Sequence, residues 1–172
     1  MKVSHQVLIS EVKSWSKTII LYIIIALFIR FFIFNLSIVP TGSMVPTIQI
    51  KDVIVVLKFS YWFQPVKRGD IVVFKSPLEK NKQLVKRVIG LGGDNILIKN
   101  GKLYINGHEY REAYIYEDMK DDFGPYLVPT DGYFVMGDNR NDSYDCRKWP
   151  DKKYITRKVV IGKAVYRFGG LK

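Results

Sequence analysis

The chain has 172 residues, with 27 Lys and Arg against 16 Asp and Glu, so its formal net charge is +11. Because 48% of its residues are hydrophobic, a disordered polyelectrolyte is excluded. One cysteine and two histidines argue against a disulfide framework and against a Cys- or His-rich metal centre, and we expect no metal and no cofactor. The basic excess alone is compatible with nucleic acid, with an anionic membrane or with a solubilising surface.

A long apolar segment follows a short polar flank. It runs from Thr18 to Val39 and reads TIILYIIIALFIRFFIFNLSIV. A helix of this length is roughly 33 Å long, enough for a bilayer hydrocarbon core of about 30 Å. We therefore predict a transmembrane helix over residues 18–39, in preference to a buried core helix or a cleavable signal peptide.

The flank at residues 1–17 contains three lysines and one glutamate. Because basic residues are enriched on cytoplasmic flanks, we expect residues 1–17 in the cytoplasm and residues 40–172 outside, in a single-pass protein of the cell membrane. Residues 1–39 carry a net charge of +3 and the remainder carries +8. The first part is typical of a topology signal and the second of a domain that rests against anionic lipid, so we expect no nucleic-acid partner.

After residue 40 the pattern changes to short β-rich runs separated by turn residues, which indicates one antiparallel β domain. The expected fold class is thus mainly β, with one N-terminal transmembrane helix. Strands are predicted at residues 53–59, 69–74, 84–91, 96–99, 133–136 and 159–168. Asn100-Gly101 and Asn106-Gly107 predict tight hairpin turns, and residues 109–129 are predicted to be a surface excursion.

The first polar cluster, residues 40–47, combines hydroxyl groups, a glycine and two prolines directly after the apolar segment. Such a loop either serves as a simple turn or presents Ser43 as a nucleophile, which requires a base within hydrogen-bond reach. Histidine is a poor candidate for that base, because His5 lies on the flank and His108 lies beside a predicted hairpin turn. Lys86, within an apolar strand, remains. If it is buried rather than solvated, its pKa falls and its amine can accept a proton.

After the Ser43 loop and the Lys86 strand, the third candidate cluster is the polar segment 137–147, directly after a predicted strand. Asp145 and Arg147 are placed to form an ion pair, and Ser143 to hydrogen-bond a lysine amine. A calcium loop is the alternative for so many Asp and Asn residues. However, the segment lacks the glycine at the sixth position and the glutamate at the twelfth that an EF-hand requires.

Together these clusters resemble the prokaryotic type I signal peptidase family, also called the leader peptidase family, and most of all its Gram-positive members. The matching segments, in chain order, are Thr41–Thr47, Gly69–Phe74, Val85–Gly90, Gly93-Asp94 and Gly137–Arg147. Lysine at position 86, rather than histidine, separates the chain from the endoplasmic-reticulum branch. Gly92 and Pro150 depart from the family pattern, which affects the expected loop geometry more than the catalytic groups.

The resemblance implies a membrane-bound serine endopeptidase that cleaves signal peptides from exported preproteins after a small-x-small motif. It implies Ser43 as nucleophile and Lys86 as general base, with the Ser43 N–H and the Thr41 hydroxyl as oxyanion hole. Ser143 would orient Lys86, and Asp145 and Arg147 would brace their loop. The implied apolar subsites for small residues are Met44, Ile48, Leu84 and Val85.

The partners that this implies are preprotein signal peptides and membrane lipid, with a location near the secretion translocon. Two other functions stay open at this point. One is a Ser-Lys self-cleaving protease of the repressor-processing type. The other is a catalytically silent, membrane-anchored β domain that binds anionic lipid or a secretion partner.

Overall fold

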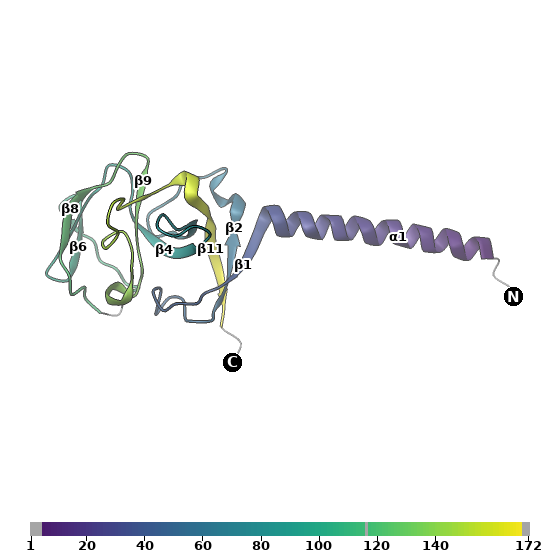
Figure 1. Ribbon diagram of the computed structural model, residues 1–172, viewed down its shortest axis with the longest axis horizontal. Helices are drawn as coiled ribbons and strands as arrows, with labels where there is room; N and C mark the ends of the chain where they lie inside the picture. The colour runs from purple at the N-terminus through teal and green to yellow at the C-terminus, as the bar shows by residue number, and fades with distance from the viewer. Residues whose placement is uncertain (1–4, 116, 170–172) are drawn as a thin grey trace.

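The computed structural model describes residues 5–115 and 117–169, which form a long N-terminal helix and a β domain. Helix α1 (His5–Phe28) projects away from the β domain (Figure 1). It continues into a π-helical turn, η1 (Ile29–Ile33), and then into strand β1 (Phe34–Ile38). Within the described ranges, none of the helices combines the length and the apolar character needed to cross a membrane.

The helix predicted over residues 18–39 was wrong at both ends, because the observed elements have other bounds. The observed helix begins at His5, and residues 34–38 are a strand that pairs in register with β2, from Phe34 opposite Leu57 to Ile38 opposite Val53. A continuous apolar run cannot by itself distinguish a helix from a strand. Here the backbone groups of residues 34–38 find their partners in a neighbouring strand, which local sequence does not reveal.

The larger of two sheets has seven strands in the order β1-β2-β11-β3-β4-β9-β10, and the recorded pairs are antiparallel. After β1, its strands are β2 (Val53–Leu57), β3 (Ile71–Lys75), β4 (Gln83–Gly90), β9 (Gly132–Met136), β10 (Ile155–Thr156) and β11 (Val160–Phe168). Short 3₁₀ turns lie between them: η2 (Lys58–Tyr61), η3 (Arg140–Asp142) and η4 (Arg157–Val159). The strands predicted for this sheet are confirmed, with ends that differ by a few residues.

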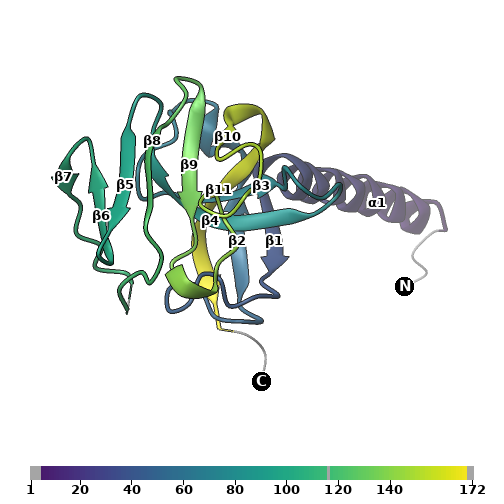
Figure 2. The ribbon, with the colours of Figure 1, turned by 60° about the vertical axis from the view of Figure 1, so that its left-hand side comes forward.

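The smaller sheet has the order β7-β6-β5-β8 and lies beside the larger one (Figure 2). Its strands are β5 (Asn95–Lys99), β6 (Lys102–Ile105), β7 (His108–Glu109) and β8 (Phe123–Leu127). Both predicted hairpin turns are confirmed, because Asn100, Gly101, Asn106 and Gly107 all have positive φ between paired strands.

The prediction of a surface excursion over residues 109–129 was wrong in part. Residues 123–127 form β8, which pairs with β5. This strand contains Pro125, and β8 lies at the edge of its sheet, where proline is tolerated.

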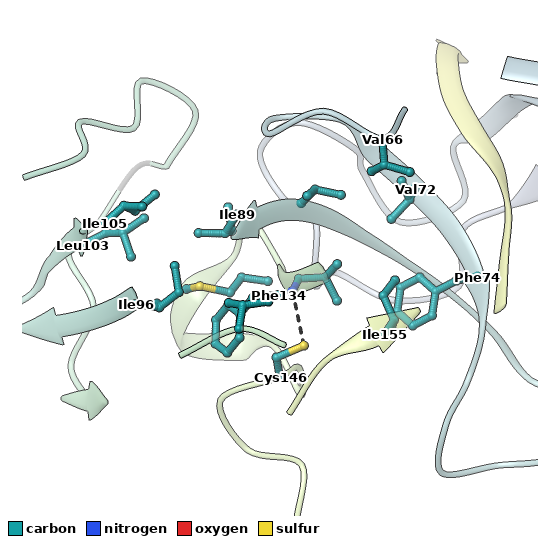
Figure 3. Close-up of a cluster of buried hydrophobic side chains, with 14 of the residues drawn as sticks. Val66, Val72, Phe74, Ile89, Ile96, Leu103, Ile105, Phe134, Cys146 and Ile155 are labelled. Atoms are coloured by element: carbon teal, nitrogen blue, oxygen red, sulfur yellow. Dashed lines mark hydrogen bonds between the residues drawn. The ribbon is translucent and has the colours of Figure 1, made fainter. Parts of the chain in front are cut away.

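Two apolar cores hold the β domain together. The main core joins the two sheets and includes Phe74, Ile96, Phe134 and Ile155, all at most 2% exposed (Figure 3). The second core lies on the opposite face of the large sheet, since consecutive residues of a strand point to opposite faces. It consists of Val39, Met44, Ile48, Ile54, Val56 and Val73.

Candidate active site

Ser43 lies in the loop between β1 and β2. Hydrogen bonds from Val39 N to Asp52 O (2.9 Å) and from Lys51 N to Val39 O (2.8 Å) close the base of this loop. Met44 and Ile48 are almost fully buried in the second core and hold the loop against the sheet. Ser43, next to a buried anchor, is thus presented by a segment with little freedom to move.

Lys86 lies in the middle of β4, opposite Val72 of β3, and is 4% exposed. Its Nζ atom donates a hydrogen bond of 2.5 Å to Ser43 Oγ. Burial lowers the pKa of Lys86 from 10.5 to about 8, although the charge of Asp145 acts in the opposite direction. The sheet therefore brings together a serine hydroxyl and a lysine amine that is partly neutral near neutral pH, which is the arrangement that nucleophilic catalysis needs.

Thr41 precedes Ser43 by two residues, and its Oγ1 atom lies 3.5 Å from Ser43 Oγ. The hydroxyl is on the exposed side of the loop. A threonine hydroxyl at this distance from the nucleophile is suited to contact the oxygen of a bound carbonyl.

The backbone of Ser43 is held by the segment that follows β9. Asn139 N donates to Ser43 O (3.1 Å), and Asn139 Nδ2 donates to Gly42 O (3.2 Å). Gly137 lies so close that an added Cβ would be 2.4 Å from both Ser43 O and Ser143 Oγ. No role was predicted for Asn139 or Gly137, although both belong to the segment 137–147 that carries the family resemblance.

Asp145 and Arg147 form the predicted ion pair. Both are buried, and Asp145 accepts hydrogen bonds from Arg147 Nε and Nη2 (both 2.9 Å) and from Gly137 N (3.0 Å). Burial alone raises the pKa of Asp145, but the hydrogen bonds and the charge of Arg147 outweigh it and hold the pKa below its ordinary value. The pair is thus ionised and fixes residues 137–147, the candidate catalytic segment, next to Gly137.

Ser143 is 3% exposed and lines the same pocket as Ser43 and Lys86. Its hydroxyl helps to lower the pKa of Asp145, yet it meets the geometry of a hydrogen bond with none of the described residues. The hydrogen bond predicted between Ser143 and Lys86 is therefore not part of this geometry, in which Lys86 donates to Ser43 instead.

The pocket beside Ser43 and Lys86 has a volume of about 390 Å³. Of the four residues predicted to form subsites, Leu84 lines this pocket and Met44, Ile48 and Val85 do not. Leu84 lines it, because Leu84 and Lys86 lie on the same face of β4. Val85 points to the other face and packs with Met44 and Ile48 in the second core. Ile48 also lines a separate pocket of about 230 Å³.

A second group of buried charges was not predicted from the sequence. Arg87, the neighbour of Lys86, pairs with Asp138 through bonds of 2.8 and 2.6 Å. Arg140 pairs with Glu112. No local signal marks Glu112, because it stands in a mixed, charged segment that is typical of a surface loop.

Among the residues the structure describes, no group of three or more His, Cys, Asp or Glu is arranged to hold a metal ion.

Comparison with known proteins matches this chain to one family. Residues 12–169 fit the family model described as "Signal peptidase, peptidase S26". The chain is 42% identical to signal peptidase I of Leptolyngbya laminosa over 160 residues, which cover 88% of this chain and 77% of that protein. It is 39% identical to signal peptidase I of Bacillus amyloliquefaciens over 169 residues, covering 92% and 89%.

The fold is also similar to a solved structure. The crystal structure of a signal peptidase I from Enterococcus faecalis V583 superimposes with a TM-score of 0.52 at 30% sequence identity. The match covers 59% of this chain and 98% of that chain. The β domain described above thus has the fold of that enzyme.

Proposed function

The chain belongs to the signal peptidase family, peptidase S26, and from this premise we propose that it cleaves N-terminal signal peptides from exported preproteins after a small-x-small motif, using Ser43 and Lys86 as a catalytic dyad. It is a peptidase by family membership. The observation that carries the residue assignment is the 2.5 Å hydrogen bond between the buried Lys86 amine and Ser43 Oγ.

In the proposed first half-reaction, neutral Lys86 takes the proton of Ser43 as Ser43 Oγ attacks the scissile carbonyl carbon. The carbonyl π electrons move to oxygen, and the resulting oxyanion accepts hydrogen bonds from Ser43 N–H and the Thr41 hydroxyl. Each such donor contributes roughly 3 kcal/mol in other hydrolases. When the intermediate collapses, the C–N bond breaks and the Lys86 ammonium gives its proton to the leaving amine. The signal peptide remains as an ester on Ser43.

In the second half-reaction Lys86, neutral again, takes a proton from a water molecule that attacks the ester carbon. The C–O bond to Ser43 then breaks, and Lys86 returns the proton to Ser43 Oγ. Lys86 acts in both halves because nothing else of suitable pKa reaches Ser43 Oγ among the described residues. In this proposal Asn139 and Gly137 hold the backbone of Ser43 in place, and the pair of Asp145 and Arg147 holds Gly137.

We also propose that the enzyme works at the cell membrane. The described side chains of α1 from Ile19 to Phe28 are exposed, and Ile19 to Ile24 are each more than half exposed. Apolar side chains left uncovered over several helical turns favour a lipid environment over water. In this proposal the apolar segment that begins at Thr18 attaches the enzyme to the membrane in a single pass, with the N-terminus cytoplasmic and the β domain outside. Preproteins would then reach it as they leave the secretion translocon.

The dyad is tested with purified protein and a preprotein that carries a small-x-small site. Ser43→Ala and Lys86→Ala are each expected to abolish cleavage. The matched variants Ser60→Ala and Lys102→Ala, at residues that do not line the pocket beside Ser43 and Lys86, should cleave like the wild type. Wild-type processing by either dyad variant would contradict the assignment. Loss of cleavage also separates this function from that of a silent lipid-binding β domain, which neither substitution would affect.

The topology is tested separately, by adding protease to protoplasts, which lack the cell wall but keep an intact cytoplasmic membrane. Degradation of the β domain together with protection of the N-terminal flank is expected. A protected β domain would contradict the proposed orientation without affecting the dyad.

A further inference from the structure

A buried ion pair connects the two sheets next to the catalytic segment. Arg140, in η3 after β9 of the large sheet, donates to Glu112 through both terminal nitrogens, with Nη2 2.6 Å from Oε1. Glu112 comes from the chain that leaves the small sheet after β7. The side chains of Arg140 and Glu112 are 0% and 2% exposed. Burying two charges costs several kcal/mol of desolvation per ion, so a pair like this is weak evidence for stability and invites another explanation.

Arg140 also holds the catalytic segment at two points. Its Nε donates to Gly137 O (3.0 Å), and its carbonyl oxygen accepts a bond of 2.6 Å from Arg147 Nη2. Gly137 is the residue against Ser43 O and Ser143 Oγ. Arg147 fixes Asp145, whose charge acts on Lys86. A shift of Arg140 would thus reach both members of the dyad.

Tyr114, two residues after Glu112, reaches the other ion pair. Its hydroxyl donates to Glu112, and the centre of its ring lies 3.9 Å from the guanidinium carbon of Arg87. Arg87 follows Lys86 in β4 and binds Asp138, the neighbour of Gly137. Glu112 and Tyr114 therefore contact both arginines that bind Gly137 and its neighbour Asp138.

We propose that Glu112 and Tyr114 are positioning residues for peptide cleavage, which hold Arg140 and Arg87 and so fix the segment around Gly137 against Ser43 and Lys86. This inference rests on the proposed dyad. Neither residue lines the pocket beside Ser43 and Lys86. Their loss should consequently change the rate of the chemical step more than substrate binding.

The test compares Glu112→Gln with Glu109→Gln. Glu109 precedes the same segment, but its ion pair with Lys102 (3.3 Å) lies on the surface. Because a displacement of about 1 Å at the reacting groups can cost about a hundredfold in rate, we expect Glu112→Gln to lower kcat at least about tenfold, with KM within about twofold. The pH at which activity is half-maximal should also move. Glu109→Gln should keep the wild-type values of all three.

A purely structural role gives a different result. If Glu112→Gln lowers Tm but leaves kcat, KM and the pH midpoint unchanged, the proposal is wrong. The double variant Glu112→Gln/Arg140→Met removes the unpaired charge, and we expect its Tm to recover while kcat stays low. Recovery of kcat along with Tm would equally overturn the proposal.

Should Glu112→Gln fail to fold, Glu112→Asp carries the test, because it keeps the charge and shortens the side chain by one methylene. It is expected to fold and to lose kcat, and a wild-type kcat would overturn the proposal. Failure of the positioning role is distinguishable from failure of the dyad. In the first case wild type cleaves and Ser43→Ala does not, whatever the result at position 112.

Discussion

Lys86 Nζ donates a hydrogen bond of 2.5 Å to Ser43 Oγ, although the two residues are 43 positions apart in the chain. The β1–β2 loop brings the hydroxyl and the centre of β4 brings the amine, and the amine is buried where they meet. The Ser43 hydroxyl is therefore in contact with an amine whose pKa is lowered, and this contact has measurable consequences.

The first consequence is a pH profile. Because burial lowers the pKa of Lys86 to about 8, the neutral amine that accepts the Ser43 proton increases as pH rises through that value. We expect kcat/KM for preprotein cleavage to rise from acid to alkaline pH, with a midpoint near 8. Circular dichroism at each pH serves as the control for folding. A profile that is flat from pH 5 to 10 would rule out Lys86 as the base.

The same lysine should limit stability. Its pKa is lower in the folded protein than the ordinary 10.5, so its charge destabilises the fold fully below about pH 8 and no longer does so above about pH 10.5. Lys86→Met is therefore expected to raise the free energy of unfolding at pH 7 by about 1–3 kcal/mol while abolishing cleavage. Urea titration measures this. The exposed Lys99→Met is the matched control, and an unchanged or lower stability of Lys86→Met would contradict the expectation.

Gly137 should tolerate no side chain. A Cβ there would lie 2.4 Å from the carbonyl oxygen of Ser43, which is backbone and has little room to move. Gly137→Ala is expected to lower stability by about 1–3 kcal/mol and to reduce kcat strongly, since Ser43 must shift. Gly169→Ala, where nothing lies within 4 Å, is the control. Normal cleavage by Gly137→Ala would show that the contact does not position Ser43.

Asp145 should contribute to stability at neutral pH. Its folded-state pKa is lowered, so its contribution is complete above the ordinary carboxyl pKa and is lost as pH falls through the folded value. Asp145→Asn leaves Arg147 buried without a counter-charge, and we expect it to cost about 3–5 kcal/mol at pH 7, measured by urea unfolding. The exposed Asp131→Asn should change little. The difference between Asp145→Asn and the wild type should shrink in acid, and a difference that grows there would contradict the sign.

Cys146 offers a check on the packing around this segment. It is fully buried, its Sγ accepts a bond from Val135 N (3.2 Å), and burial raises the pKa of its thiol (Figure 3). Because the thiolate is the reactive form, the native protein should react with a thiol reagent only after unfolding. Rapid labelling of the folded enzyme, followed by absorbance, would mean that the segment opens more readily than its packing suggests.

Local pattern was sufficient for the elements whose signals are local. The hairpins at Asn100-Gly101 and Asn106-Gly107 follow from residues that accept positive φ. It was insufficient at residues 34–38, where apolar continuity predicted a helix, and at β8, where the mixed, proline-containing composition predicted a loop. In both places the deciding factor is a partner strand far away in the sequence.

By itself the sequence determined the class of the protein. The order of the motifs around Ser43, Lys86 and Asp145 predicted the family, and that resemblance implied which residues would act as nucleophile, base and ion pair. Only the tertiary structure decided how close Ser43 and Lys86 lie, which face of β4 each subsite residue takes, and that Glu112 contacts the catalytic segment through Arg140. Distance, burial and the resulting pKa depend on contacts between strands and loops that are remote in the chain, and no local pattern encodes them.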